Sequence, residues 1–320
     1  MEMGERWIPG SRMEPWFAGF GLSSIFGRKV FGWLGVLWPG VPVRFQDRVD
    51  RILSARDSLL CVGLDPDAAQ MPRAIRRMGA KPGLRKFLGS IIQATRPYAA
   101  AYKMQLASYL AYGADGIECL EELPSKIGPT RLRILDLKAN DIPNTMRLLR
   151  EAAFKRMGFD AVTVTPWMGW ESLAPFLGDD RHGCFLVAHS SNPGSSDFQE
   201  IPTPRGPLWL AIVAETRRLA AAHGNVGVVV GATFVEAIRS ARETLGNGVP
   251  ILVPGVGAQG GQLSATVREG VDGRGRALLI NASRSILYAS TAEDWLTAAA
   301  TEARRLCGQI NQLRAGLRTG

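Results

Sequence analysis

Eight short apolar runs recur between residues 59 and 280, separated by longer amphipathic stretches, and this alternation restricts the fold more than any other feature. Nearly continuous apolar runs are typical of parallel strands that are covered on both faces. The runs are 59–64, 99–102, 132–137, 161–164, 184–188, 226–230, 251–253 and 277–280. Helical segments between them include 84–95, 146–157, 207–222, 233–245 and 262–269. This pattern predicts an α/β fold, a closed (β/α)8 TIM barrel rather than an open sheet.

The composition supports one large core preceded by a different segment. Hydrophobic residues make up 46% of the 320 residues and charged residues 21%, a balance that excludes a disordered chain. The sequence contains no uninterrupted run of ~18 apolar residues, so we predict no membrane-spanning helix. Residues 1–43 hold four of the eight tryptophans and show no helical or strand period. We therefore predict a poorly ordered N-terminal extension over 1–43 and a single barrel domain over 44–320.

Cysteine, histidine and charge narrow the classes of function. The four cysteines are widely separated and form no C-x-x-C pair, which favours a reducing cytoplasm over a disulfide framework. Three histidines are too few for a histidine-rich metal site. The net charge of +9 suits an anionic partner, either nucleic acid or a phosphorylated small molecule. The basic residues are scattered, which favours the small molecule.

Charged side chains gather where the predicted strands end, which is where (β/α)8 enzymes place their chemistry. Asp65 ends the first run, Lys103 the second, and Asp136 and Lys138 the third. Positions i and i+2 of a strand face the same way, so Asp136 and Lys138 point together, while Asp141 follows in the loop. Taken alone, D-x-K could be a solvated ion pair. An array of alternating charge, however, would hold a lysine protonated and suits a general acid.

The last two strand ends predict a phosphate site. The glycine-rich segment 253–261 closes the seventh run, and 281–286 closes the eighth. Loops after strands seven and eight frequently bind phosphate in this architecture. Glycines let backbone N–H groups approach the anion, and Arg284 can donate two hydrogen bonds to its oxygens.

Several motifs together resemble orotidine 5′-phosphate decarboxylase, in the bacterial subgroup with longer chains (type 2). The resemblance runs from about 59 to 288 and rests on L-D-P, D-x-K-x-x-D-I, S-S-N-P-G, P-G-V-G-A-Q-G-G and S-R. The subgroup often reads D-A-K-R-G-D-I, and D-L-K-A-N-D-I here keeps both aspartates and the lysine. The resemblance implies a carboxy-lyase that converts orotidine 5′-phosphate to UMP and CO2 in de novo pyrimidine biosynthesis. It also implies a cytoplasmic homodimer with active sites shared across the interface, and neither metal nor cofactor.

The resemblance further implies a role for each candidate residue. Lys138 would protonate C6 of the pyrimidine, Asp136 would lie near the substrate carboxylate, and Lys103 would bridge the ribose and the charged array. Asp141 would act in the active site of the partner subunit. The implied substrate-binding residues are Asp65 for a ribose hydroxyl, Ser191 for the pyrimidine edge, Gln259 and Arg284 for the phosphate, and Ile142 and Thr145 across the dimer interface.

Two alternatives belong to other classes. A related (β/α)8 sugar-phosphate lyase would share D-x-K-x-x-D, but those relatives generally use Mg²⁺ with an acidic residue after strand two, where this chain has Lys103. A basic nucleic-acid-binding module would need arginines clustered with aromatic residues, which the sequence does not show. The metal-free decarboxylase is therefore favoured.

Overall fold

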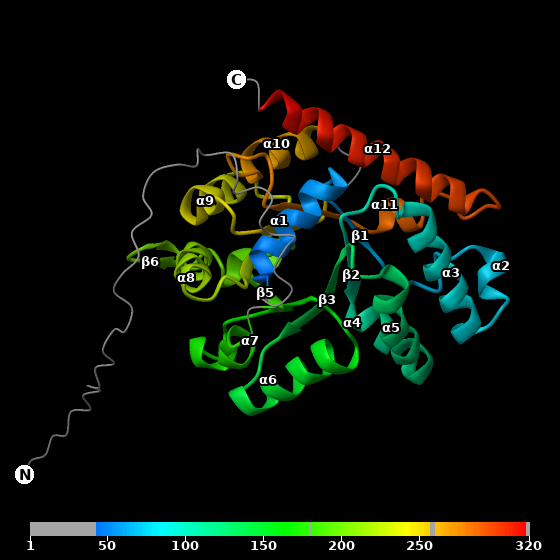
Figure 1. Cartoon of the computed structure of the whole chain (residues 1–320), viewed down its shortest axis with the longest axis horizontal. Coiled ribbons are helices and arrows are strands. Elements are labelled where there is room, and N and C mark those ends of the chain that lie inside the picture. The colour runs from blue at the N-terminus through cyan, green and yellow to red at the C-terminus, as the bar shows by residue number, and fades with distance from the viewer. Residues whose placement is uncertain (1–42, 180, 257–259, 318–320) are drawn as a thin grey trace, which may run out of the picture. The chain divides into compact units, whose positions relative to one another are not determined.

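The predicted barrel is confirmed by the structure, a computed structural model that describes residues 43–179, 181–256 and 260–317. The prediction for residues 1–43 falls almost wholly outside these residues. Eight parallel strands pair in chain order, and β10 closes the barrel on β1 (Figure 1). The strands are β1 (Leu60–Gly63), β2 (Ala101–Gln105), β3 (Leu132–Ala139), β4 (Ala161–Val164), β5 (Gly183–His189), β8 (Val226–Val230), β9 (Ile251–Pro254) and β10 (Leu278–Ala282).

Helices surround these strands and protect their apolar side chains from water (Figure 1). They are α1 (Phe45–Arg56), α2 (Arg73–Arg76), α3 (Ala80–Thr95), α4 (Leu106–Leu110), α5 (Gly113–Ile127), α6 (Pro143–Arg150), α7 (Ala174–Leu177), α8 (Leu208–His223), α9 (Val235–Leu245), α10 (Gly260–Gly270), α11 (Arg284–Leu287) and α12 (Trp295–Gly316). Shorter elements are the π-helix η2 (Glu151–Arg156), the 3-10 helices η3 (Trp170–Leu173) and η4 (Pro193–Asp197), and the β6 (Pro202–Thr203) and β7 (Gly206–Pro207) hairpin. Within the described ranges, no helix has the length and apolar character needed to cross a membrane.

All eight predicted strands and all five predicted helical segments are present. Each predicted apolar run overlaps one barrel strand, because these strands are buried on both faces and need no polar alternation. The segment predicted over 146–157 is α6 continued by η2, where the backbone widens from an α-helix to a π-helix. The sequence patterns did not single out α5 and α12, two of the longest helices. α5 contains Pro124, which interrupts the usual helical pattern.

Helix α1 packs against the start of the strands, opposite the end that carries the charged residues. Phe45 is fully buried and meets the ring of Phe185 edge-on, with 6.0 Å between ring centroids. A Cβ at Gly183, the first residue of β5, would lie 2.2 Å from the Phe45 ring, so glycine is needed for this close approach. Gln46 adds a hydrogen bond from its side-chain amide to the carbonyl of Val226 (2.9 Å). These contacts fix the N-terminal end of the barrel.

We expect Phe45→Ala to lower the free energy of unfolding by about 3–5 kcal/mol, because the substitution leaves a cavity between α1 and β5. Chemical denaturation measures this change. Arg44→Ala, at the residue before Phe45, is the matched control. The Arg44 side chain is mostly exposed and contacts Asp47 at the surface, so the free energy of unfolding should hardly change. Equal stability of both variants would show that α1 does not contribute to the core.

Candidate active site

Strand β3 ends in a bulge that places Lys138 in an unusual backbone conformation. The pairing register of β3 with β4 shifts between Leu135 and Ala139, and Lys138 has φ +46°. A non-glycine residue in this left-handed region is strained by about 1–3 kcal/mol, so surrounding contacts must hold it. One such contact is the hydrogen bond from the Lys138 backbone N–H to Oγ1 of Thr163 on β4 (2.9 Å). Strain of this kind is often found at functional sites.

The charged residues predicted at the strand ends form one connected array. Asp136 lies between two ammonium groups: Lys103 Nζ is 2.8 Å from its Oδ2, and Lys138 Nζ is 2.6 Å from its Oδ1. Thr163 donates a third hydrogen bond to Asp136 Oδ1 (2.8 Å). Asp65 extends the array, with its Oδ2 3.9 Å from Lys103 Nζ. Lys103 and Asp136 are buried, whereas the Lys138 side chain is 48% exposed and faces the open end.

Burial and charge act in opposite directions on the pKa values of this array. Burial raises the pKa of Asp136, but the ammonium groups of Lys103 and Lys138 outweigh it and hold the pKa at about 2. Burial lowers the pKa of Lys103, but Asp65 and Asp136 outweigh it and leave the pKa above its usual value. Both groups are therefore charged at neutral pH, and each depends on its partner to remain so.

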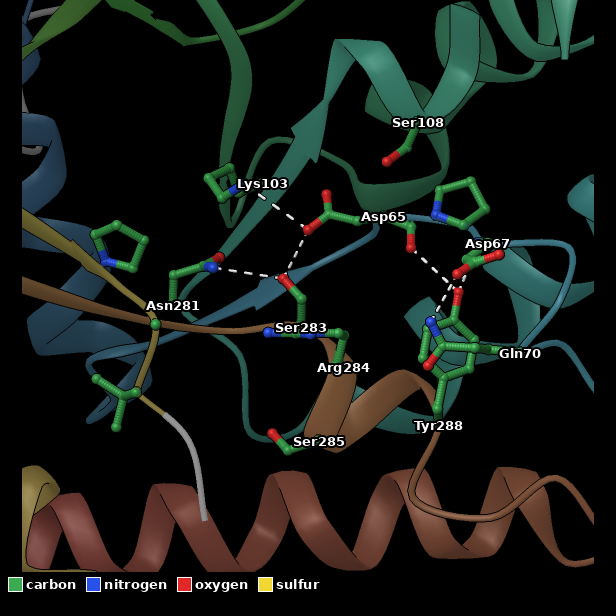
Figure 2. Close-up of a pocket in the computed structure, with 14 residues that line it drawn as sticks. Asp65, Asp67, Gln70, Lys103, Ser108, Asn281, Ser283, Arg284, Ser285 and Tyr288 are labelled. Carbon is green, nitrogen blue, oxygen red and sulfur yellow. Dashed lines mark hydrogen bonds and ion pairs between the residues drawn. The ribbon is translucent and has the colours of Figure 1, made fainter. Parts of the chain in front are cut away.

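Two adjacent cavities meet at Lys103 and Pro254. The smaller, of about 220 Å³, is lined by Lys103, Asp136 and Lys138 together with Ser191. The larger, of about 420 Å³, contains Asp65 and Arg284 (Figure 2). An elongated ligand could place one end at Lys138 and the other at Arg284, with Asp65 near its middle.

The structure separates three of the predicted residues from these cavities. Asp141 and Ile142 follow β3, and Thr145 lies in the first turn of α6. None of the three is among the described residues that line either cavity. The Ile142 side chain is 54% exposed. Gln259, the other predicted phosphate ligand, lies outside the described residues.

Two hydroxyl residues of the site were not predicted. Thr163 holds both Asp136 and the Lys138 backbone, and its place near the end of the fourth apolar run, 161–164, was the available signal. Ser283 donates a hydrogen bond to Asp65 Oδ2 (2.7 Å), while the backbone N–H of Gln105 donates to Asp65 Oδ1 (2.9 Å). Asp65 is thus fixed from two strands.

The arrangement can stabilise negative charge and deliver a proton at one point. The Lys138 ammonium is fixed beside Asp136 and opens onto the smaller cavity. A preorganised cation stabilises a developing carbanion more effectively than mobile water does. The same ammonium can then act as a general acid.

Comparison with known proteins gives a consistent result. The orotidine 5′-phosphate decarboxylase / HUMPS family model matches residues 58–298. Orotidine 5′-phosphate decarboxylase of Bordetella pertussis is 40% identical over 272 residues, which cover 84% of this chain and 99% of that protein. The Thermomicrobium roseum protein of the same name is also 40% identical, with 84% and 96% covered. The structure of Leishmania donovani OMP decarboxylase superposes with a TM-score of 0.73 at 32% identity, covering 85% of this chain and 99% of that one.

We expect Asp136→Asn to lower the free energy of unfolding by about 3–5 kcal/mol at neutral pH, because it leaves the buried Lys103 ammonium without its closest counter-charge. Denaturant titration measures the loss. The low pKa of Asp136 in the folded protein, about 2, adds stability above the unfolded-state value of about 4. The difference between wild type and variant should therefore shrink as the pH falls below about 4. Glu118→Gln, which breaks the surface pair with Lys81, should change stability little.

Proposed function

The chain belongs to the orotidine 5′-phosphate decarboxylase / HUMPS family, and on that premise we propose how its residues carry out the reaction. The enzyme is a carboxy-lyase of pyrimidine biosynthesis that converts orotidine 5′-phosphate to UMP and CO2. The observation that carries the residue assignment is the position of Asp136 between the ammonium groups of Lys103 and Lys138.

Lys138 acts on C6 of the pyrimidine. When the bond between C6 and the carboxylate breaks, CO2 leaves and the electron pair remains on C6. The Lys138 ammonium stabilises this charge, donates a proton to C6, and regains a proton from solvent. Enzymes can lower the activation free energy of a reaction by on the order of 20 kcal/mol. A fixed positive charge beside C6 contributes to this by stabilising the transition state. Asp136 keeps Lys138 in place, which its 2.6 Å contact with the ammonium supports.

The rest of the substrate lies along the two cavities. Ser191 contacts the pyrimidine edge in the smaller cavity, and Asp65 accepts a hydrogen bond from a ribose hydroxyl. Arg284, with Gln259, binds the phosphate. The phosphate is distant from C6, so its binding energy is available to order the charged array around the reacting group.

The active enzyme is a homodimer in which Asp141, Ile142 and Thr145 reach the active site of the partner subunit. Their positions outside the cavities of their own subunit support this arrangement. Ile142 itself and Leu148 of α6 are exposed apolar side chains, which supports an interface on this part of the surface.

A cytoplasmic location fits the chemistry of the thiols. The four cysteines are free, and three of them are buried. Burial raises the pKa of the Cys61 and Cys184 thiols to about 12 each, so both stay protonated in the core. Free thiols of this kind are typical of a reducing compartment.

The loss of orotidine 5′-phosphate absorbance on addition of the purified protein, in buffer with EDTA, tests the reaction and its independence of metal. We expect Lys138→Ala to reduce turnover by at least about 1,000-fold, because it removes the counter-charge and the proton donor together. Lys155→Ala removes a lysine that is 68% exposed on η2 and should keep wild-type turnover. Near-normal activity of a folded Lys138→Ala protein would contradict the assignment, and turnover that EDTA abolishes would favour the Mg²⁺-dependent lyase.

A mixture of two inactive variants tests the shared active site. Lys138→Ala and Asp141→Ala proteins should each be nearly inactive. After subunit exchange, each heterodimer has one site with both lesions and one with neither, because a two-fold interface repeats the same contact twice. An equal mixture should therefore recover up to about one quarter of wild-type activity. If differential tags confirm the heterodimer but no activity returns, Asp141 does not act across the interface.

A further inference from the structure

Ser283 links two strands that carry different parts of the substrate site. Its hydroxyl donates to Asp65 Oδ2 (2.7 Å) and accepts a longer hydrogen bond from the Asn281 side chain (3.4 Å). Figure 2 shows Ser283 between Asn281 and Asp65, with Arg284 as the next residue along the chain. Ser283 and Asp65 are 218 positions apart in the sequence. Their hydrogen bond joins the ends of β10 and β1, which are neighbours in the barrel.

Two local features are adapted to this contact. Ser283 occupies the N-cap position of α11, where a serine hydroxyl usually bonds its own helix, yet it makes no cap hydrogen bond. Gly63 provides the space, because a Cβ at this position would lie 1.7 Å from the Ser283 hydroxyl oxygen. The hydroxyl therefore bonds to Asp65 rather than to its own helix, and Gly63 on the neighbouring strand β1 leaves room for it.

A second contact holds the same two segments together. The Tyr288 hydroxyl, at the end of α11, accepts a hydrogen bond from the backbone N–H of Asp67 (2.7 Å) and donates to the Asp65 carbonyl (3.2 Å). Arg284 lies between Ser283 and Tyr288 in sequence, so both contacts flank the proposed phosphate ligand. The loop after β1 is thereby attached to the segment that carries Arg284.

We propose that Ser283 is a positioning residue that sets the spacing between the ribose site at Asp65 and the phosphate site at Arg284. The inference rests on the proposed function, which assigns these two residues to the ribose and the phosphate. In one substrate molecule the covalent bonds limit how far apart these groups can lie, so the carboxylate and the guanidinium must be held within a matching distance. A ligand that contacts both residues depends on this spacing, and a ligand that contacts only Asp65 does not.

Substrates with and without the phosphate test the proposal. We expect Ser283→Ala to lower kcat/KM for orotidine 5′-phosphate by roughly 10- to 100-fold, the range for loss of a hydrogen bond to a charged group. For orotidine, which lacks the phosphate, the loss should be below about threefold. Ser283→Ala can also be added to a protein that already carries Arg284→Ala. There it should lower kcat/KM for orotidine 5′-phosphate by no more than Ser283→Ala lowers kcat/KM for orotidine. Equal losses for both substrates, multiplicative losses in the double variant, or no loss would each overturn the proposal.

Binding measurements separate this proposal from the proposed function. Calorimetry of UMP and uridine does not require turnover, and Ser283→Ala should weaken UMP binding selectively. If the wild type fails to decarboxylate orotidine 5′-phosphate, the proposed function fails, while the comparison of UMP with uridine still tests the spacing. Tyr288→Phe removes the second contact and should show the same selectivity for the phosphorylated ligand.

The matched control is Ser290→Ala. Ser290 also donates its hydroxyl to an aspartate, Asp294 (2.5 Å), but in the loop before α12 and outside both cavities. This variant should keep the wild-type ratio of kcat/KM for the two substrates. A shift of that ratio in Ser290→Ala as large as in Ser283→Ala would show that the effect is not specific to the contact with Asp65.

Discussion

The contact of one buried carboxylate with two lysines governs the rest of the active site. Lys103 is almost completely buried, and an ammonium in that position is tolerable only with a close counter-charge. Asp136 provides this charge and in turn depends on Lys138, whose ammonium faces the open cavity. The β3 bulge, the left-handed backbone at Lys138 and the two hydrogen bonds of Thr163 all hold this geometry. The strain and the burial of charge are thus concentrated in the candidate active site.

The barrel could be predicted because its strands leave a simple signal. Parallel strands buried on both faces read as short apolar runs, and eight such runs leave few other folds. The local irregularities leave no such signal. The bulge at the end of β3 is a shift in its pairing register with β4, and α6 continues as the π-helix η2; the pattern of residue types predicts neither. The confirmed architecture and the missed details therefore have different physical origins.

The candidate site was predictable to the extent that it consists of strand ends. Asp65 and Lys103 follow apolar runs and Asp136 lies near the end of one, and the spacing of Asp136 and Lys138 predicts that they face the same way. The contact of Ser283 with Asp65 could not be predicted, because it depends on the closure of the barrel and on the space that Gly63 leaves. The roles of Asp141, Ile142 and Thr145 concern a second subunit and stay predictions.

The seam between β1 and β10 has a consequence for how the enzyme is made. Leu60 pairs with Ile280, and the Asp65 carboxylate accepts a hydrogen bond from the hydroxyl of Ser283, 218 residues later in the chain. During synthesis, the other barrel strands are all made before β1 can pair with β10, which is the last of the eight. Contacts between such distant residues form late, since a long loop must close first. We therefore expect nascent chains that stop before residue 278 to expose an unpaired edge at β1 and to lack the Ser283 contact with Asp65. Unpaired strand edges of this kind are prone to aggregation until the last strand is made.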